Sequence, residues 1–114
     1  MKDSKQILDL VVEAIDNKHG EQTVALDMKD SSVMADYLVI TQANSHRQLQ
    51  AIVDEIVDES KKQSAEILQV EGDKNSEWLL IDLYDVIVNV FLPDARDFYA
   101  LEKLFADAKL VQLD

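Results

Sequence analysis

The strongest constraint on the fold lies in segment 78–91, where apolar residues alternate with other side chains on both sides of a short turn. Successive side chains of a strand point to opposite faces of a sheet, and a two-residue loop keeps the faces of two antiparallel strands in register. One face of this hairpin is then wholly aliphatic: Leu79, Ile81, Leu83, Val86, Val88 and Val90. Such a face has to be buried, so the fold needs other elements to cover it.

The second face of the hairpin has a mixed character, and we define it by six residues: Trp78, Leu80, Asp82, Ile87, Asn89 and Phe91. It is too apolar to face water alone, yet it contains a carboxylate and an amide. In one interpretation, a helix of the same chain covers it and Asp82 accepts a hydrogen bond from a backbone amide. In the other, it is a docking surface anchored by Trp78, because aromatic side chains in desolvated pockets dominate interface energetics.

Two amphipathic helices can cover the aliphatic face. From Ser4, apolar residues recur at helical spacing as far as Ile15, and Gly20 follows as a stop signal. A longer helix opens at Ser45, where Gln48 completes a capping-box pattern. Its apolar side consists of Leu49, Ile52, Val53, Ile56 and Val57. The two helices therefore supply two apolar stripes for one core.

The remaining elements complete a mixed sheet. Three apolar runs before the hairpin predict strands over 23–28, 37–40 and 67–70. After the hairpin, Pro93 blocks further strand pairing and Asp94 can cap a last helix with apolar positions Phe98, Leu101, Leu104 and Phe105. Residues 110–113 can add a short terminal strand. The order helix, two strands, helix, three strands, helix predicts an α/β (α+β) fold, with a mixed five-stranded sheet flanked by helices in one domain spanning 1–114.

Charge and composition narrow the classes of function. The net charge is −12, from 23 acidic and 11 basic residues. Proteins that bind nucleic acid gain affinity by neutralising phosphates with clustered Lys and Arg, so direct RNA or DNA binding is disfavoured and a basic partner is a better complement. No apolar run is long enough for a signal peptide or a membrane span. We therefore expect a cytoplasmic protein without membrane contact.

Patterns typical of catalysis are weak in this sequence. The chain has no cysteine, its two histidines lack the spacing of a metal-binding helix, and its two glycines belong to no phosphate-binding loop. Asp82 and Asp85 form the best carboxylate pair, but sites that hold two metal ions usually recruit more carboxylates than this turn offers. We expect no enzyme activity, no metal site and no cofactor.

Several motifs occur in a defined order: Asp30-Ser31-Ser32, Ala35 to Ile40, Asn44 to Gln48, Glu71-Gly72, Trp78 to Asp82 with Asp85, Val88 to Phe91, and Arg96 to Glu102. In this order and spacing they resemble the ribosomal silencing factor family, also called the Iojap family. The resemblance runs from about residue 5 to residue 108. It implies a nucleotidyltransferase-like fold without the catalytic motifs.

The resemblance also implies a translational repressor. Members of this family bind the large ribosomal subunit through its fourteenth protein, on the face that meets the small subunit, and hinder subunit joining when nutrients are scarce. Ribosomal proteins are typically basic, so an acidic chain is a suitable partner. Our hypothesis for the contact residues is Trp78 as anchor, Asp82 and Asp85 as partners of basic side chains, Tyr84 as an exposed aromatic contact, and Glu71 and Arg96 at the margin.

Two departures from the family pattern concern the hairpin. Tyr84 stands where the family commonly has glycine, so we expect a turn of different type or length, because glycine tolerates a positive φ. Asn89 stands where histidine is frequent. Two alternative functions also remain: a nucleotidyltransferase-like enzyme, which would need Gly-Ser where this chain has Asn44-Ser45, and a homodimeric adaptor without a ribosomal role. A homodimer of the free protein is compatible with each of these functions.

Overall fold

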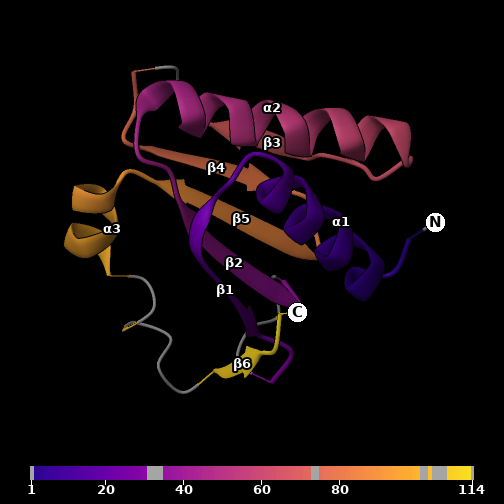
Figure 1. Cartoon of the computed structure of the whole chain (residues 1–114). Helices are drawn as coiled ribbons and strands as arrows, with labels where there is room; N and C mark the ends of the chain where they lie inside the picture. Colours follow the sequence, from indigo (N-terminus) through magenta and orange to yellow (C-terminus); the bar gives the residue numbers. More distant parts are fainter. Residues whose placement is uncertain (1, 31–34, 73–74, 101–102, 104–107, 114) are drawn as a thin grey trace.

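The structure is a computed structural model of the chain, and it describes residues 2–30, 35–72, 75–100, 103 and 108–113 (Figure 1). The elements in chain order are α1 (Ser4–Asn17), β1 (Glu21–Asp27), β2 (Tyr37–Gln42), α2 (His46–Lys62), β3 (Gln69–Glu71), β4 (Trp78–Asp82), β5 (Val86–Phe91), α3 (Pro93–Tyr99) and β6 (Lys109–Val111). The predicted order of the first eight elements is confirmed. Within these described ranges, no helix has both the length and the apolar character needed to cross a membrane.

The strands form one mixed sheet in the order β3-β4-β5-β2-β1-β6. The central strands β2 and β5 are parallel, and every other neighbouring pair is antiparallel. The prediction of five strands is therefore wrong by one, because β6 pairs with the outer edge of β1. The short terminal strand predicted within 110–113 is confirmed as β6, and the count of five had left it out.

The helices α1 and α2 lie together on one face of the sheet (Figure 1). The aliphatic face of the hairpin packs beneath them, and each of its six residues is at most 2% exposed. The apolar side of α2 joins the same core cluster, together with Leu8 and Val11 of α1. The predicted burial of this face by two amphipathic helices is thus confirmed.

Gln48 joins the start of α2 to the end of α1. As predicted, Ser45 is the N-cap of α2 and its Oγ accepts the N–H of Gln48 at 3.1 Å. The reciprocal bond differs from a capping box, because Gln48 Oε1 accepts the N–H of Asn44 at 2.8 Å. Gln48 Nε2 donates instead to the carbonyl oxygens of Lys18 at 3.2 Å and His19 at 2.9 Å. The predicted box is half formed, and the side chain of Gln48 links the two helices.

The end of α1 explains the requirement for Gly20. The left-handed residue of this turn is His19, with φ of 62°, while the N–H of Gly20 donates to the carbonyl oxygen of Ile15 at 3.0 Å. A Cβ on Gly20 would lie 2.4 Å from Ile15 Cγ2 and 2.9 Å from Thr41 Oγ1. Glycine is needed here for the close approach of the α1 terminus to β2.

The helix α3 covers part of the opposite face of the sheet, at the end where β5 finishes (Figure 1). It begins at Pro93 with Leu92 as N-cap, so Asp94 lies in the first turn and the prediction that it caps the helix is wrong. Proline fits the first helical position because its φ is already helical and its missing N–H is not needed there. Ala95 packs against Phe91 in a second core cluster, together with Leu26, Met28, Leu38 and Ile40. The expected helical positions Leu101, Leu104 and Phe105, and the side chain of Phe98, lie outside what the structure describes.

Candidate docking surface

The second face of the hairpin lies on the side of the sheet away from α1 and α2. Trp78 is opposite Phe91, Leu80 is opposite Asn89 and Asp82 is opposite Ile87. Phe91 and Asn89 are each 1% exposed, whereas the other four residues are half-buried. Among the described residues, the cover from the same chain is thus densest over Asn89 and Phe91 of β5, at the α3 end, and lighter over β4. Cover by a helix of the same chain is confirmed at the α3 end, and Asp82 accepts a backbone N–H, that of Tyr84. The docking interpretation stays a prediction.

Trp78 is held in position by two contacts across the hairpin. Its ring stacks on Phe91 with centroids 5.1 Å apart and an interplanar angle of 28°. Its Nε1 donates a hydrogen bond to Asn89 Oδ1 at 3.0 Å. The second bond also satisfies the buried amide of Asn89. An aromatic side chain that is already ordered loses little entropy on binding a partner, so the indole is a pre-organised anchor.

The turn between β4 and β5 is a two-residue loop formed by Tyr84 and Asp85. The N–H of Leu83 donates to the carbonyl oxygen of Val86 at 2.9 Å, so the assumed loop length is confirmed. Tyr84 has φ of 68°, the left-handed conformation that glycine adopts without strain. A change in turn type or length was expected, and the loop keeps its two-residue length without glycine. A hydrogen bond of 2.8 Å from the N–H of Tyr84 to Asp82 Oδ1 stabilises this left-handed conformation in the absence of glycine.

The turn is also tied to the start of β2. The carbonyl oxygen of Asp85 accepts the N–H of Asp36 at 2.8 Å and the N–H of Tyr37 at 3.1 Å. Next to it, Lys29 Nζ donates to Tyr37 Oη at 2.9 Å and lies 4.7 Å from the centroid of that ring. The hydrogen bond to Tyr37 raises the pKa of Lys29 above its ordinary value. The chain thus already places one cation on a tyrosine ring at this end of the sheet.

The predicted contact residues extend along a strip rather than forming one cluster. Trp78 begins β4 and the turn lies at its other end, about 13 Å away at the usual rise of a strand. Glu71 is exposed and pairs with Leu80, so it lies beside the middle of β4. Tyr84 is 47% exposed and the side chain of Asp85 is also exposed. We call the strip from Trp78 to Asp85, with Glu71 beside it, the docking surface.

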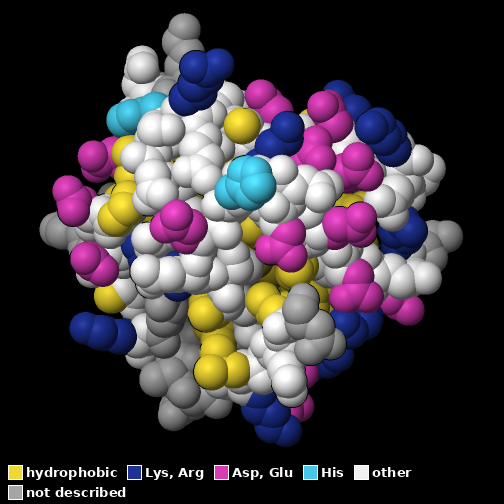
Figure 2. Space-filling model, in the orientation of Figure 1, with side chains coloured by type: hydrophobic (Ala, Val, Ile, Leu, Met, Phe, Trp, Pro, Cys, Tyr) yellow, Lys and Arg dark blue, Asp and Glu magenta, His cyan; other side chains and the backbone are white. Residues whose placement is uncertain are grey.

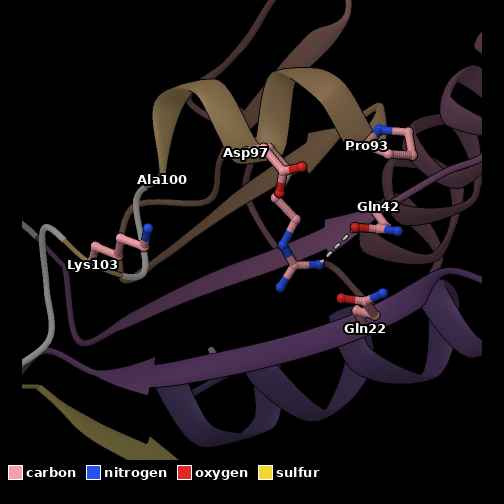
Figure 3. A pocket seen from close by; sticks show the side chains of 7 residues that line it. Gln22, Gln42, Pro93, Asp97, Ala100 and Lys103 are labelled. Atoms are coloured by element: carbon pink, nitrogen blue, oxygen red, sulfur yellow. Dashed lines mark hydrogen bonds between the residues drawn. The ribbon is translucent and has the colours of Figure 1, made fainter.

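Arg96 lies apart from the docking surface, in a polar pocket beneath α3. It is only 6% exposed, and its Nη1 donates to Gln42 Oε1 at 3.4 Å. Figure 3 shows this pocket, which has a volume of about 370 Å³ and is lined by Gln22, Gln42, Pro93, Arg96, Asp97, Ala100 and Lys103. Arg96 therefore links α3 to β2, and a partner could contact it only through a group small enough to enter the pocket.

The described residues show no geometry for metal-assisted catalysis. They contain no group of three or more His, Asp or Glu side chains placed to hold a metal ion. The carboxylate of Asp82 already accepts the backbone N–H of Tyr84, and the hydroxyl of Ser45 caps α2. Figure 2 shows acidic side chains spread across the face that carries α1 and α2, with basic side chains scattered among them. On that face, the basic side chains form no continuous patch of the kind that binds nucleic acid.

Comparisons of the sequence with protein families and with known proteins identify the same family. The family model described as "Ribosomal silencing factor during starvation" matches residues 1–114. A ribosomal silencing factor of Halalkalibacterium halodurans is 45% identical, over 97% of this chain and 95% of its own length. The ribosomal silencing factor of Bacillus subtilis is 44% identical, over 96% of this chain and 93% of its own.

Structural and more distant relatives agree with these matches. A crystal structure of a Bacillus halodurans protein superimposes with a TM-score of 0.85 at 43% identity, covering 96% of this chain and 99% of that one. A Mus musculus relative named "Mitochondrial assembly of ribosomal large subunit protein 1" is 26% identical, over 93% of this chain and 50% of its own length.

Proposed function

The chain belongs to the ribosomal silencing factor family, and from this premise we propose that it represses translation by binding the large ribosomal subunit through that subunit's fourteenth protein. Bound there, it blocks joining with the small subunit, above all when nutrients are scarce. Membership rests on the match over residues 1–114 and on relatives of similar length at 44% and 45% identity. The partner protein and the step that is blocked are the proposal.

The observation that carries this proposal is the docking surface with its oriented tryptophan. Trp78 is half-buried, stacked on Phe91 and hydrogen-bonded to Asn89, so it offers a fixed aromatic face beside the half-buried Leu80. Carboxylates border this apolar strip, with Glu71 on one side and Asp85 at the turn. An ordered aromatic anchor with a charged rim is the usual composition of a protein–protein hot spot.

Charge supports a basic protein partner. The net charge of −12 creates a negative potential around the molecule, which raises the rate at which a basic surface meets it and helps to orient the two. The same charge disfavours contact with the phosphates of ribosomal RNA. We therefore place the contact on a protein of the subunit rather than on its RNA.

To block subunit joining, the protein only needs to occupy the face of the large subunit that meets the small one. The molecule measures 33 × 32 × 26 Å along its principal axes. A body of this size on the face where the two subunits meet holds the surfaces apart, without turnover and without a conformational change. The proposed mechanism is therefore steric, and its strength depends on how long the protein stays bound.

Co-sedimentation with isolated ribosomal subunits tests the proposal. We expect the protein to pellet with large subunits and not with small subunits. Trp78→Ala should weaken binding by about 2 kcal/mol, provided that circular dichroism shows the variant to be folded. Binding of both subunits alike, or of neither, would contradict the proposal.

A charge reversal with a matched control locates the surface. Glu71→Lys places a positive charge beside β4 and should weaken binding, because the partner is basic. Asp58→Lys makes the same change on the exposed side of α2, which covers the opposite face of the sheet. We expect Asp58→Lys to have the smaller effect at equal ionic strength. Equal losses would show that only net charge matters, and the docking surface would then lie elsewhere.

A further inference from the structure

The turn between β4 and β5 holds an aromatic residue in a strained conformation. Tyr84 has φ of 68°, and the N–H of Asp85 donates to the carbonyl oxygen of Leu83 at 2.9 Å. A bond between residues two apart around a positive φ defines the rarer and more strained form of the γ-turn. A bulky side chain in this region is an outlier, and it persists only where the surrounding structure imposes it.

Hydrogen bonds from three sides impose this conformation. Asp82 Oδ1 accepts the N–H of Tyr84 at 2.8 Å. The N–H of Leu83 donates to Val86 across the hairpin, and Leu83 itself is 1% exposed. The carbonyl oxygen of Asp85 accepts two amides from the start of β2. The backbone therefore fixes the direction in which the Tyr84 side chain leaves the turn before any partner binds.

The Tyr84 side chain borders a groove at this end of the molecule. The groove has a volume of about 490 Å³ and is lined by Lys2, Ile7, Ser64, Ala65, Glu66, Leu83, Tyr84 and Asp85. Ile7, Ala65 and Leu83 are buried and give it an apolar floor. The carboxylates of Glu66 and Asp85 are exposed at its rim. The site thus combines an aromatic ring, an apolar floor and two negative charges, with Lys2 as the one positive charge among its lining residues.

We propose that Asp82 is a positioning residue that holds Tyr84 at the rim of this groove, where the ring receives an arginine side chain of the ribosomal protein. The proposal rests on the proposed function and specifies part of its contact. Arginine fits because its guanidinium stacks on aromatic rings and its aliphatic stem packs on apolar surface. Asp85 and Glu66 would pair with the charge. Asp82 then acts through Tyr84 and not as a direct partner of a basic residue.

Two substitutions of Asp82 separate positioning from direct contact. Asp82→Asn removes the charge but keeps a side-chain oxygen that can accept the N–H of Tyr84, whereas Asp82→Ala removes both. In the free protein, we expect the Tyr84 amide to exchange slowly with solvent in wild type and Asp82→Asn, and at least tenfold faster in Asp82→Ala. Asp82→Asn should keep its affinity for the isolated fourteenth protein within about threefold, and Asp82→Ala should lose about fivefold.

Substitutions of Tyr84 test the ring. Tyr84→Phe should bind like wild type, and Tyr84→Ala should lose about fivefold, the ratio that corresponds to one exposed cation–π contact. Unchanged binding by Tyr84→Ala would overturn the arginine contact. Equal losses of affinity in Asp82→Asn and Asp82→Ala would show that a basic group of the partner pairs directly with the Asp82 carboxylate. If wild type binds no large subunit, the proposed function fails and the arginine contact fails with it. The amide exchange rates then decide the positioning role alone.

Discussion

Asn89 shows how a single amide determines the orientation of the proposed anchor. It is 1% exposed, and its Oδ1 accepts the indole N–H of Trp78. A histidine, the residue that the family resemblance led us to expect here, could also present an acceptor nitrogen to that N–H. The polar residue on an otherwise apolar face is therefore explained by the tryptophan that it orients.

Asn89→Leu preserves most of the side-chain volume but removes the acceptor. We expect the free energy of unfolding to fall by about 1 kcal/mol, because the indole N–H loses its partner in a partly desolvated position. Urea unfolding measures this change. Asn17→Leu, at the exposed end of α1, is the control: it removes only a solvent-exposed hydrogen bond to Glu55 at 3.2 Å and should shift stability by less than about 0.5 kcal/mol. Equal shifts in the two variants would show that the Trp78 contact contributes nothing.

At the residue scale, the sequence predicted the composition of the second face but not its contacts. Alternation placed Trp78, Asp82 and Asn89 on one face, and the structure confirms that placement. The bond between Trp78 and Asn89 could not be predicted, because it depends on the register of the two strands. The conformation of Tyr84 was also missed, because the carboxylate two residues earlier compensates for the missing glycine.

At the scale of elements, long periodic segments were predicted securely, and short ones were predicted with less accurate bounds. The hairpin and the two long helices follow directly from alternation of period two and from helical spacing. β6 has only three residues, and its pairing with β1 supplies a structure that its own sequence does not encode strongly. The start of α3 was misplaced by two residues, because Pro93 both ends strand pairing and begins the helix.

Gln48 offers a test of how the helices are joined. Gln48→Ala removes the hydrogen bonds to Asn44, Lys18 and His19, so we expect a loss of about 1 to 2 kcal/mol in the free energy of unfolding. Gln50→Ala is a matched control in the same helix, because among the described residues the side chain of Gln50 donates only to Asp54 Oδ1, at 2.9 Å. Thermal unfolding measures the loss of stability in each variant. A larger effect in Gln50→Ala would contradict the bridging role of Gln48.

At the scale of the whole molecule, asymmetric cover of the sheet creates the docking surface. α1 and α2 completely bury the aliphatic face of the hairpin. Among the described residues, α3 covers the second face mainly at one end. The sequence predicted that the second face must be covered, but not which of its residues α3 covers and which remain accessible to a partner. The answer depends on where a short helix packs, which no local sequence pattern indicates.

The net charge predicts how binding responds to salt. Raising the ionic strength from about 0.05 M to 0.3 M shortens the screening length, so the association rate with large subunits should fall by about tenfold. The dissociation rate should change much less, because it depends on the packed contact around Trp78. Stopped-flow or surface-binding kinetics separate the two rates. An association rate independent of salt would rule out electrostatic steering.

The most direct test of the central claim is the joining of ribosomal subunits, followed by light scattering after purified large and small subunits are mixed. With large subunits first saturated by this protein, we predict a marked loss of joined ribosomes, and Trp78→Ala at the same concentration should restore most of the joining. Normal joining in the presence of bound wild-type protein would contradict the account.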